Sequence, residues 1–192
     1  MTFQTHELAG ASRVPANYLW ALAIWALCEA TFWFVAPDFL LIPLAIFFPR
    51  DWLRIALAGW GASVVGGAAY FAIVASFPES SSRVLASTPF ISARMHAFIK
   101  GLYEQYGYWG ALAQSWSFMT LKVWTLEAVK EGFNFFPYYV IVSFSRIFRL
   151  FVVTRIAARF SVVVRPFWSD RPLLAWGLYS TGFIGMLFVM ES

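Results

Sequence analysis

Long apolar runs, broken by prolines and charged residues, are the feature that most constrains this chain. Of its 192 residues, 60% are hydrophobic and only 12% are charged, whereas soluble domains average ~45–50% apolar and ~25% charged residues. This composition argues against a soluble domain and also excludes a disordered, collagen-like or coiled-coil chain. Cys28 is the single cysteine, which excludes a disulfide scaffold. The sequence therefore predicts one all-α polytopic membrane domain.

The first apolar run, 18–48, is interrupted by Pro37–Asp38 and again by Pro43. A membrane-crossing helix needs ~20 apolar residues, but the short stretch 39–48 after the break would rise only ~15 Å as a helix. We interpret 18–48 as a re-entrant hairpin with both prolines as hairpin-breaking residues; two poorly formed spans are the alternative. Residues 1–17 do not begin like a signal peptide and are expected in the cytoplasm or at the membrane interface.

The second apolar run, 55–77, carries no charge and is typical of a transmembrane helix. Its small residues recur every four positions, in the stripes Gly59–Ser63–Gly67 and Ala58–Ala62–Gly66. Such stripes let another backbone approach closely, and close packing holds helices together in lipid. We therefore place this helix at the centre of the bundle.

The rest of the chain alternates surface and membrane segments. We predict a loop at 78–89, an amphipathic surface helix at 90–106, a second re-entrant hairpin at 108–132, a spanning helix at 135–160, a basic linker at 161–172 and a C-terminal spanning helix at 173–190. This topology puts seven basic residues on the N-terminal side (Arg13, Arg50, Arg54, Arg155, Arg159, Arg165, Arg171) and three on the other (Arg83, Arg94, Lys100). The positive-inside rule then places the N-terminus in the cytoplasm and the C-terminus outside, with three to four spans in total. The net charge of +4 thus reflects loop asymmetry and does not favour nucleic-acid binding.

Several motifs occur in the order of these segments: Glu29 ahead of Phe32–Trp33–Phe34, Pro37–Asp38–Phe39–Leu40–Leu41–Ile42–Pro43–Leu44, the small-residue helix 58–70, Tyr106–Gly107–Tyr108–Trp109, Lys122–Val123–Trp124–Thr125–Leu126, Asn134–Phe135–Phe136–Pro137, and Ser145–Arg146 through Arg149–Leu150–Phe151. Over about 27–160 the chain resembles the DedA family (the VTT or SNARE-associated domain family), and within it the short YqaA-like branch. The resemblance implies an inverted-repeat architecture in the bacterial inner membrane. It also implies translocation of a polyprenyl phosphate or a phospholipid, with suspected proton coupling and no cofactor.

The chain departs from this branch mainly in its second hairpin. Phe118 and Thr120 stand where the branch has prolines, and Ser145 replaces a glycine. Glu127 and Val129 replace small residues. These departures predict a second hairpin that is more helical or altered in activity.

Six ionisable residues lie within or beside the apolar runs: Glu29, Asp38, Lys122, Glu127, Arg146 and Arg149. A charged residue at the centre of a transmembrane helix costs ~2.5–3.5 kcal/mol on insertion scales. Each of the six must therefore pair with an opposite charge, face a wet cavity, or reach the interface. We assign them together to a substrate or proton pathway.

The roles of individual charges stay open at this point. Arg146 and Arg149 share one helix face, and the depth of Arg146 favours a polar cavity over snorkelling to the interface. Asp38 and Lys122 lie near the two hairpin tips, where they either pair with each other or serve in gating or ligand binding. Glu29 is either the partner of an arginine or a titrating group.

No other residues form a convincing reactive site. His6 and His96 are far apart in the sequence, which excludes a transition-metal site, and no Ser or Cys has an evident base, so we expect no enzyme activity. Deep arginines suit a lipid phosphate, because a guanidinium binds it bidentately. The sequence thus favours a lipid translocase with membrane lipids as partners. A non-transporting structural or assembly protein is the alternative, and self-association stays open.

Overall fold

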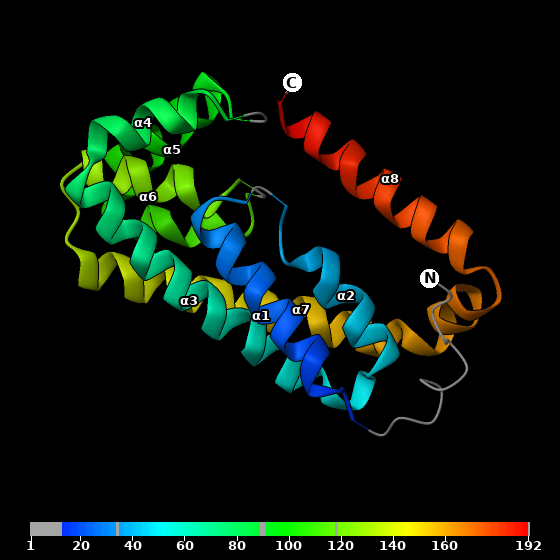
Figure 1. Ribbon diagram of the computed structural model, residues 1–192. Coiled ribbons are helices and arrows are strands. Elements are labelled where there is room, and N and C mark those ends of the chain that lie inside the picture. The colour runs from blue at the N-terminus through cyan, green and yellow to red at the C-terminus, as the bar shows by residue number, and fades with distance from the viewer. Residues whose placement is uncertain (1–12, 34, 89–90, 118, 192) are drawn as a thin grey trace.

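The first apolar run folds into two antiparallel helices, α1 (Ala16–Thr31) and α2 (Asp38–Phe47) (Figure 1). The computed structural model describes residues 13–33, 35–88, 91–117 and 119–191. Helix α1 ends where the Thr31 hydroxyl donates to the carbonyl groups of Leu27 and Cys28. Pro37 then disfavours helix at the residue before it, and its fixed φ of −64° suits the start of α2.

The two ends of this hairpin lie together. The Val14 N–H donates to Asp51 Oδ2 at 2.5 Å, which brings the residues before α1 next to those after α2. Inside the hairpin the Trp25 indole N–H donates to the carbonyl of Val35 and holds the connecting segment against α1. This is the reversal that the Pro37–Asp38 break predicts; its relation to a membrane stays a prediction.

Pro43 does not break the chain, contrary to the sequence-based interpretation. It lies inside α2, where it cannot donate the usual backbone hydrogen bond to the Phe39 carbonyl. The hydroxyl of Tyr179 compensates from another helix, donating to the carbonyl groups of Asp38 at 3.0 Å and of Phe39 at 3.4 Å. A tertiary donor thus supports a helix that the local sequence alone would weaken.

The short helix η2 (Pro49–Asp51) leads into α3 (Trp52–Ser76), which runs through the middle of the molecule beside α1 and α7 (Figure 1). Within the described part of the chain, one helical stretch, Pro49–Ser76, is long and apolar enough to cross a membrane. The predicted spans 135–160 and 173–190 form helix as well, and their crossing of a membrane stays a prediction.

The segment predicted as a loop, 78–89, instead begins with a helix, α4 (Pro78–Ala86). Pro78 occupies the first turn, where a missing N–H is harmless, and Glu79 follows it near the positive end of the helix dipole. The predicted surface helix is present as α5 (Ala93–Tyr106). Its buried residues, Met95, Ile99 and Tyr103, recur every four positions along one face.

The second hairpin consists of the 3₁₀ helix η3 (Gly107–Ser115) and the α-helix α6 (Leu121–Lys130). Its ends also lie together, because the Asn134 N–H donates to the Tyr108 hydroxyl at 2.9 Å. The two hairpins close at opposite ends of α3. Asp51 precedes the first residue of α3, whereas Phe71 near the last contacts Phe135, next to Asn134.

Helix α7 (Phe135–Asp170) is much longer than the predicted span. The predicted basic linker 161–172 is wrong, since the helix continues through Pro166 to Asp170 and only Arg171 separates it from α8 (Pro172–Glu191). At ~1.5 Å per residue α7 is ~54 Å long, well beyond the ~30 Å of a bilayer core. Helix α8 then turns back toward α2 (Figure 1). Tyr179 of α8 stacks on Phe39 of α2, with ring centroids 5.4 Å apart.

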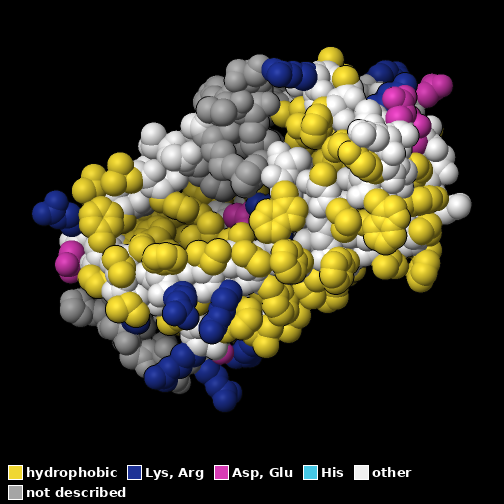
Figure 2. Space-filling model, turned by 180° about the vertical axis from the view of Figure 1, so that it is seen from behind, with side chains coloured by type: hydrophobic (Ala, Val, Ile, Leu, Met, Phe, Trp, Pro, Cys, Tyr) yellow, Lys and Arg dark blue, Asp and Glu magenta, His cyan; other side chains and the backbone are white. Residues whose placement is uncertain are grey.

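Large apolar side chains also lie on the outside. Trp20, Phe136, Phe144 and Val162 are all exposed. In Figure 2 a broad band of hydrophobic side chains crosses the visible face, and most Lys and Arg side chains lie along its edges or beyond them. A soluble monomer rarely exposes so much contiguous apolar surface.

The small residues of α3 allow the predicted close approach of another helix at Gly66. A Cβ added at Gly66 would lie 2.8 Å from Ala30 Cβ and 2.9 Å from the Leu27 carbonyl oxygen, both on α1. By contrast, a Cβ added at Gly61 on the same helix would meet nothing within 4 Å. Gly66 therefore sets how closely α1 approaches α3.

We predict that Gly66→Ala destabilises the detergent-solubilised protein by about 1–3 kcal/mol, because the backbone of α1 must move. Gly61→Ala is the matched control, and it should keep or raise stability by up to ~1 kcal/mol through helix propensity. Thermal unfolding followed by circular dichroism measures both variants. Equal midpoints would show that the close α1–α3 contact does not form.

Candidate functional site

Two ion pairs join the first hairpin to α7. Arg146 donates to Glu29 Oε2 at 2.9 Å, and Arg149 donates to Asp38 Oδ2 at 2.5 Å. Arg146 and Arg149 lie one turn apart on α7, while the two carboxylates come from the end of α1 and the start of α2. The break between α1 and α2 thus brings both carboxylates to one helix face.

Both pairs are largely removed from solvent. The Glu29 and Arg146 side chains are 6% and 10% exposed, and those of Asp38 and Arg149 are 7% and 18% exposed. Of the three environments expected for a buried charge, Arg146 has the first, an opposite charge, which Glu29 supplies. Buried charges at this depth persist only when they are paired, which makes each pair a condition for folding as well as a candidate site.

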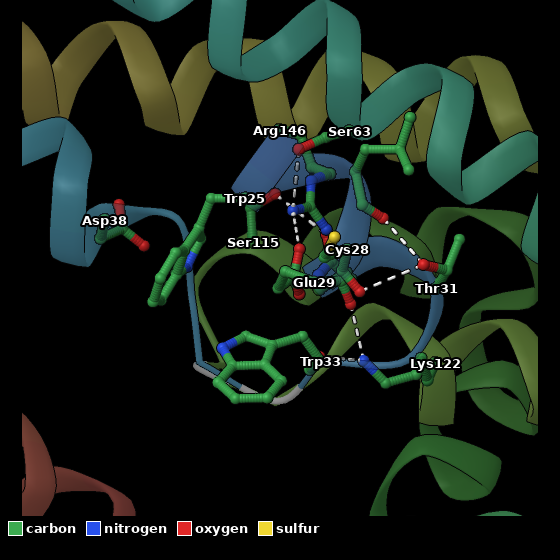
Figure 3. Close-up of polar contacts among 12 residues, drawn as sticks. Trp25, Cys28, Glu29, Thr31, Trp33, Asp38, Ser63, Ser115, Lys122 and Arg146 are labelled. Carbon is green, nitrogen blue, oxygen red and sulfur yellow. Dashed lines mark hydrogen bonds and ion pairs between the residues drawn. The ribbon is translucent and has the colours of Figure 1, made fainter. Parts of the chain in front are cut away.

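Arg146 has a second partner on α3. One of its guanidinium nitrogens donates to the Ser63 hydroxyl at 3.4 Å (Figure 3). Ser63 belongs to the small-residue stripe of α3, together with Gly59 and Gly67. Because these residues are small, α3 lies close enough to the pair for a short hydroxyl to reach it. The stripe therefore contributes to the site as well as to packing.

Lys122 brings the second hairpin to the same place. Its ammonium group donates to the Glu29 carbonyl at 2.6 Å and to the Trp33 carbonyl. The last carbonyl groups of a helix lack intrahelical donors and carry the negative end of its dipole, so a lysine there is favourable. The tips of the two hairpins thus meet through a lysine that caps α1 (Figure 3).

The interpretation of Asp38 and Lys122 as a mutual ion pair is therefore wrong. Asp38 pairs with Arg149, and Lys122 binds backbone carbonyl groups. Opposite charges near two hairpin tips suggested the pair. The sequence could not show that the first hairpin offers the lysine a helix end, nor that α7 faces Asp38.

The second carboxylate oxygen of Asp38 has no such partner. Among the described residues Asp38 Oδ1 is buried and accepts no hydrogen bond. A buried carboxylate oxygen without a donor is costly unless a proton or a ligand reaches it.

Glu127 pairs with residues other than the two arginines. It bonds His96 Nδ1 at 2.8 Å and Lys130 Nζ at 2.8 Å, and so ties α6 to the amphipathic helix α5. That Glu127 belongs to one pathway with the other buried charges stays a prediction, and nothing in the sequence indicates that His96 is its partner. The structure gives Glu127 partners of its own, on α5 and in the last turn of α6.

We define the central charge cluster as Glu29, Asp38, Lys122, Arg146 and Arg149. With all five groups ionised, three cations face two carboxylates, so the cluster carries a net charge of +1.

Sequence reasoning missed Tyr179, whose hydroxyl donates to the backbone carbonyl of Asp38. The sequence does hold a signal for such a residue. A proline inside a helix leaves the carbonyl group four residues earlier without its usual backbone donor, so a donor from elsewhere is expected.

Comparison with known proteins adds little to this geometry. No sequence profile of a known protein family matches the chain, and no solved structure matches it. An uncharacterized protein of Haemophilus influenzae is 28% identical over 130 residues, which cover 68% of this chain and 67% of that protein. The resemblance to the DedA family therefore continues to rest on the motifs of the sequence.

We predict that Glu29→Gln alone lowers the free energy of unfolding by about 3–5 kcal/mol, because it leaves Arg146 buried without a counter-charge. The double variant Glu29→Gln/Arg146→Gln should recover a large part of this loss. Glu104→Gln breaks an exposed pair with Lys100 and should change nothing measurable. Unfolding of the purified protein in detergent measures these free energies. The prediction is contradicted if the double variant loses more free energy of unfolding than the two single variants lose together.

Proposed function

We propose that the chain is a polytopic membrane protein that moves a lipid with an anionic head group between the two leaflets. One observation carries the proposal: a buried cluster of three basic and two acidic side chains lies where the tips of two hairpins meet. The hairpins close at opposite ends of α3. A site at the meeting point of two oppositely directed hairpins suits alternating access. The resemblance to the DedA family supports the same activity.

The surface of the molecule supports the placement in a membrane. Pro49–Ser76 is long and apolar enough to cross, and large apolar side chains are exposed on α1, α3 and α7. In the proposed arrangement 135–160 and 173–190 also cross, and 18–48 and 108–132 enter and return. The membrane is the bacterial inner membrane, with the N-terminus in the cytoplasm.

The charges of the cluster support an anionic substrate. A phosphate or phosphodiester would take the place of Glu29 beside Arg146, because a guanidinium binds either oxyanion through two parallel N–H donors. Exchanging one anion for another keeps the Arg146 guanidinium paired in both states, and Glu29 is the group that must then be neutralised. The excess of one positive charge favours a polyprenyl phosphate or an anionic phospholipid over a zwitterionic one.

Proton coupling follows from the carboxylates in this proposal. When an anion binds, Glu29 loses its arginine, and Asp38 already has a buried oxygen with no donor among the described residues. Protonation of either group removes a negative charge that would otherwise repel the substrate. We assign the proton to this pair of carboxylates and the head group to Arg146.

The topology is tested with single cysteines in a Cys28→Ala background. Arg13 and Arg50 are exposed at the base of the first hairpin, and Glu131 is exposed at the base of the second. We predict that impermeant thiol reagents label Arg13→Cys and Arg50→Cys from the cytoplasm and Glu131→Cys from the other side. Labelling of Arg13→Cys and Arg50→Cys from opposite sides would contradict the re-entrant hairpin.

Transport is tested in proteoliposomes that contain fluorescent lipids with phosphate or choline head groups. We predict that Arg146→Gln lowers the rate of phosphate-lipid movement at least tenfold, because one charge-assisted bidentate contact is lost. Arg159→Gln is the control, an exposed arginine on the same helix. Parent protein that moves neither lipid would contradict the proposal.

A structural or assembly protein is the second candidate, and the complete pairing of Glu29 and Arg146 favours it. The double variant Glu29→Gln/Arg146→Gln separates the two functions. If it folds normally and cells that depend on the protein grow normally, the cluster serves only pairing. If it folds but fails to support growth and transport, the charges act on a substrate.

A further inference from the structure

A cavity of about 370 Å³ lies beside the central charge cluster, between α3, α4, the end of α1 and the start of α6. Its volume falls within the range of small-molecule sites. Thr31 and Lys122 contribute to its wall, and Figure 3 shows both on the opposite side of Glu29 from Asp38. The cavity is therefore distinct from the place where Arg146 and Arg149 meet their carboxylates, and it shares only Lys122 with the central charge cluster.

Tyr70 supplies an unused polar group in the wall of this cavity. The residue is only 6% exposed, and its hydroxyl has no hydrogen-bond partner among the described residues. Buried hydroxyl groups of tyrosine usually find a partner, because leaving one unpaired costs free energy. A ligand that bonds this hydroxyl would remove that cost.

Lys122 supplies a second donor. An ammonium group has three N–H donors and no acceptor, and Lys122 uses two of them on the carbonyl groups of Glu29 and Trp33. The ligand must therefore offer an acceptor. Because the cluster that contains Lys122 has three basic and two acidic side chains, an anionic acceptor is favoured over a neutral one.

The remaining wall is apolar. Phe32, Ile73, Phe77 and Val84 line the cavity and are themselves exposed at its mouth. A volume of 370 Å³ holds a small head group and a short length of hydrocarbon, about 12 groups of the size of water or methylene. The exposed apolar mouth lets the rest of a chain continue along the surface of α3 and α4.

We propose that this cavity binds a single-chain amphiphile with a carboxylate head group, such as a fatty acid. The Tyr70 hydroxyl and the third N–H of Lys122 each donate to one carboxylate oxygen, and the hydrocarbon leaves between α3 and α4. Two donors match the two oxygens of a carboxylate, whereas a phosphate would leave a third charged oxygen without a donor. This site does not depend on the proposed transport activity.

The test uses dodecanoate as the probe, with dodecanol and dodecyl phosphate as matched single chains. Binding to the full chain in maltoside detergent is titrated by native mass spectrometry. We expect one dodecanoate per chain, weaker binding of dodecyl phosphate and much weaker binding of dodecanol. Equal or tighter binding of either of these two would overturn the proposal.

Variants locate the site. Tyr70→Phe removes only a hydroxyl that bonds nothing in the described chain, so folding is kept, and dodecanoate affinity should fall about tenfold or more. Ser80→Phe, an exposed position at the cavity, should block binding without loss of stability. Tyr106→Phe, at an exposed position outside the cavity, is the control and should bind like the parent. Unchanged binding by both Tyr70→Phe and Ser80→Phe would overturn the assignment.

Discussion

The ion pair between Arg146 and Glu29 is the contact on which the rest of the arrangement depends. A buried guanidinium and a buried carboxylate are each costly alone, and they are tolerated only when their geometry is held in place. Here α3 holds that geometry, because Gly66 lets α1 approach and Ser63 adds a hydrogen bond to Arg146. The pair in turn fixes the end of α1 against the first third of α7. The small residues of α3 and the buried charges of α1 and α7 look unrelated in the sequence, but they stabilise the same contact.

Lys122 extends this constraint to the second hairpin. Lys122 donates to the carbonyl groups of Glu29, in the last turn of α1, and of Trp33, just beyond that helix. It thereby ties the two hairpin tips to each other while their bases lie at opposite ends of α3. The contacts at the tips are polar, so other polar groups can replace them, and the bases are far apart. This arrangement suits a protein whose hairpins move separately. In our proposal an anionic head group binds the arginine, and a proton neutralises the carboxylate that the arginine releases.

Features that depend on short-range sequence were predictable, and features that depend on distant partners were not. The reversal at Pro37–Asp38 and the stripe of α3 follow from local rules for proline and for small residues. The cost of burial predicted that Arg146 needs a counter-charge, a wet cavity or the interface, and only the fold shows that Glu29 supplies the counter-charge. Pro43 looked like a break because the donor that compensates for it, Tyr179, is 136 positions away in the sequence on α8. Pairing of Lys122 with Asp38 was one of two roles that the sequence left open, and it is wrong because Lys122 instead binds the Glu29 backbone carbonyl near the end of α1, which no residue type in the sequence indicates. The continuation of α7 through Pro166 likewise has no local signal, since a proline and a run of basic residues usually mark a linker.

The central claim is that the buried cluster becomes accessible from both sides of a membrane, and Ser63 is the position that tests it most directly. Its side chain is 1% exposed and lies within 3.4 Å of Arg146, and Ser63→Cys changes its size little. In a Cys28→Ala background, the account predicts that impermeant thiosulfonate reagents modify this cysteine from either face of the membrane. An anionic reagent should react faster than a cationic one of similar size, and excess phosphate-bearing lipid should slow both. A cysteine that stays unreactive from both faces, or reacts from one face only under all conditions, would contradict the account.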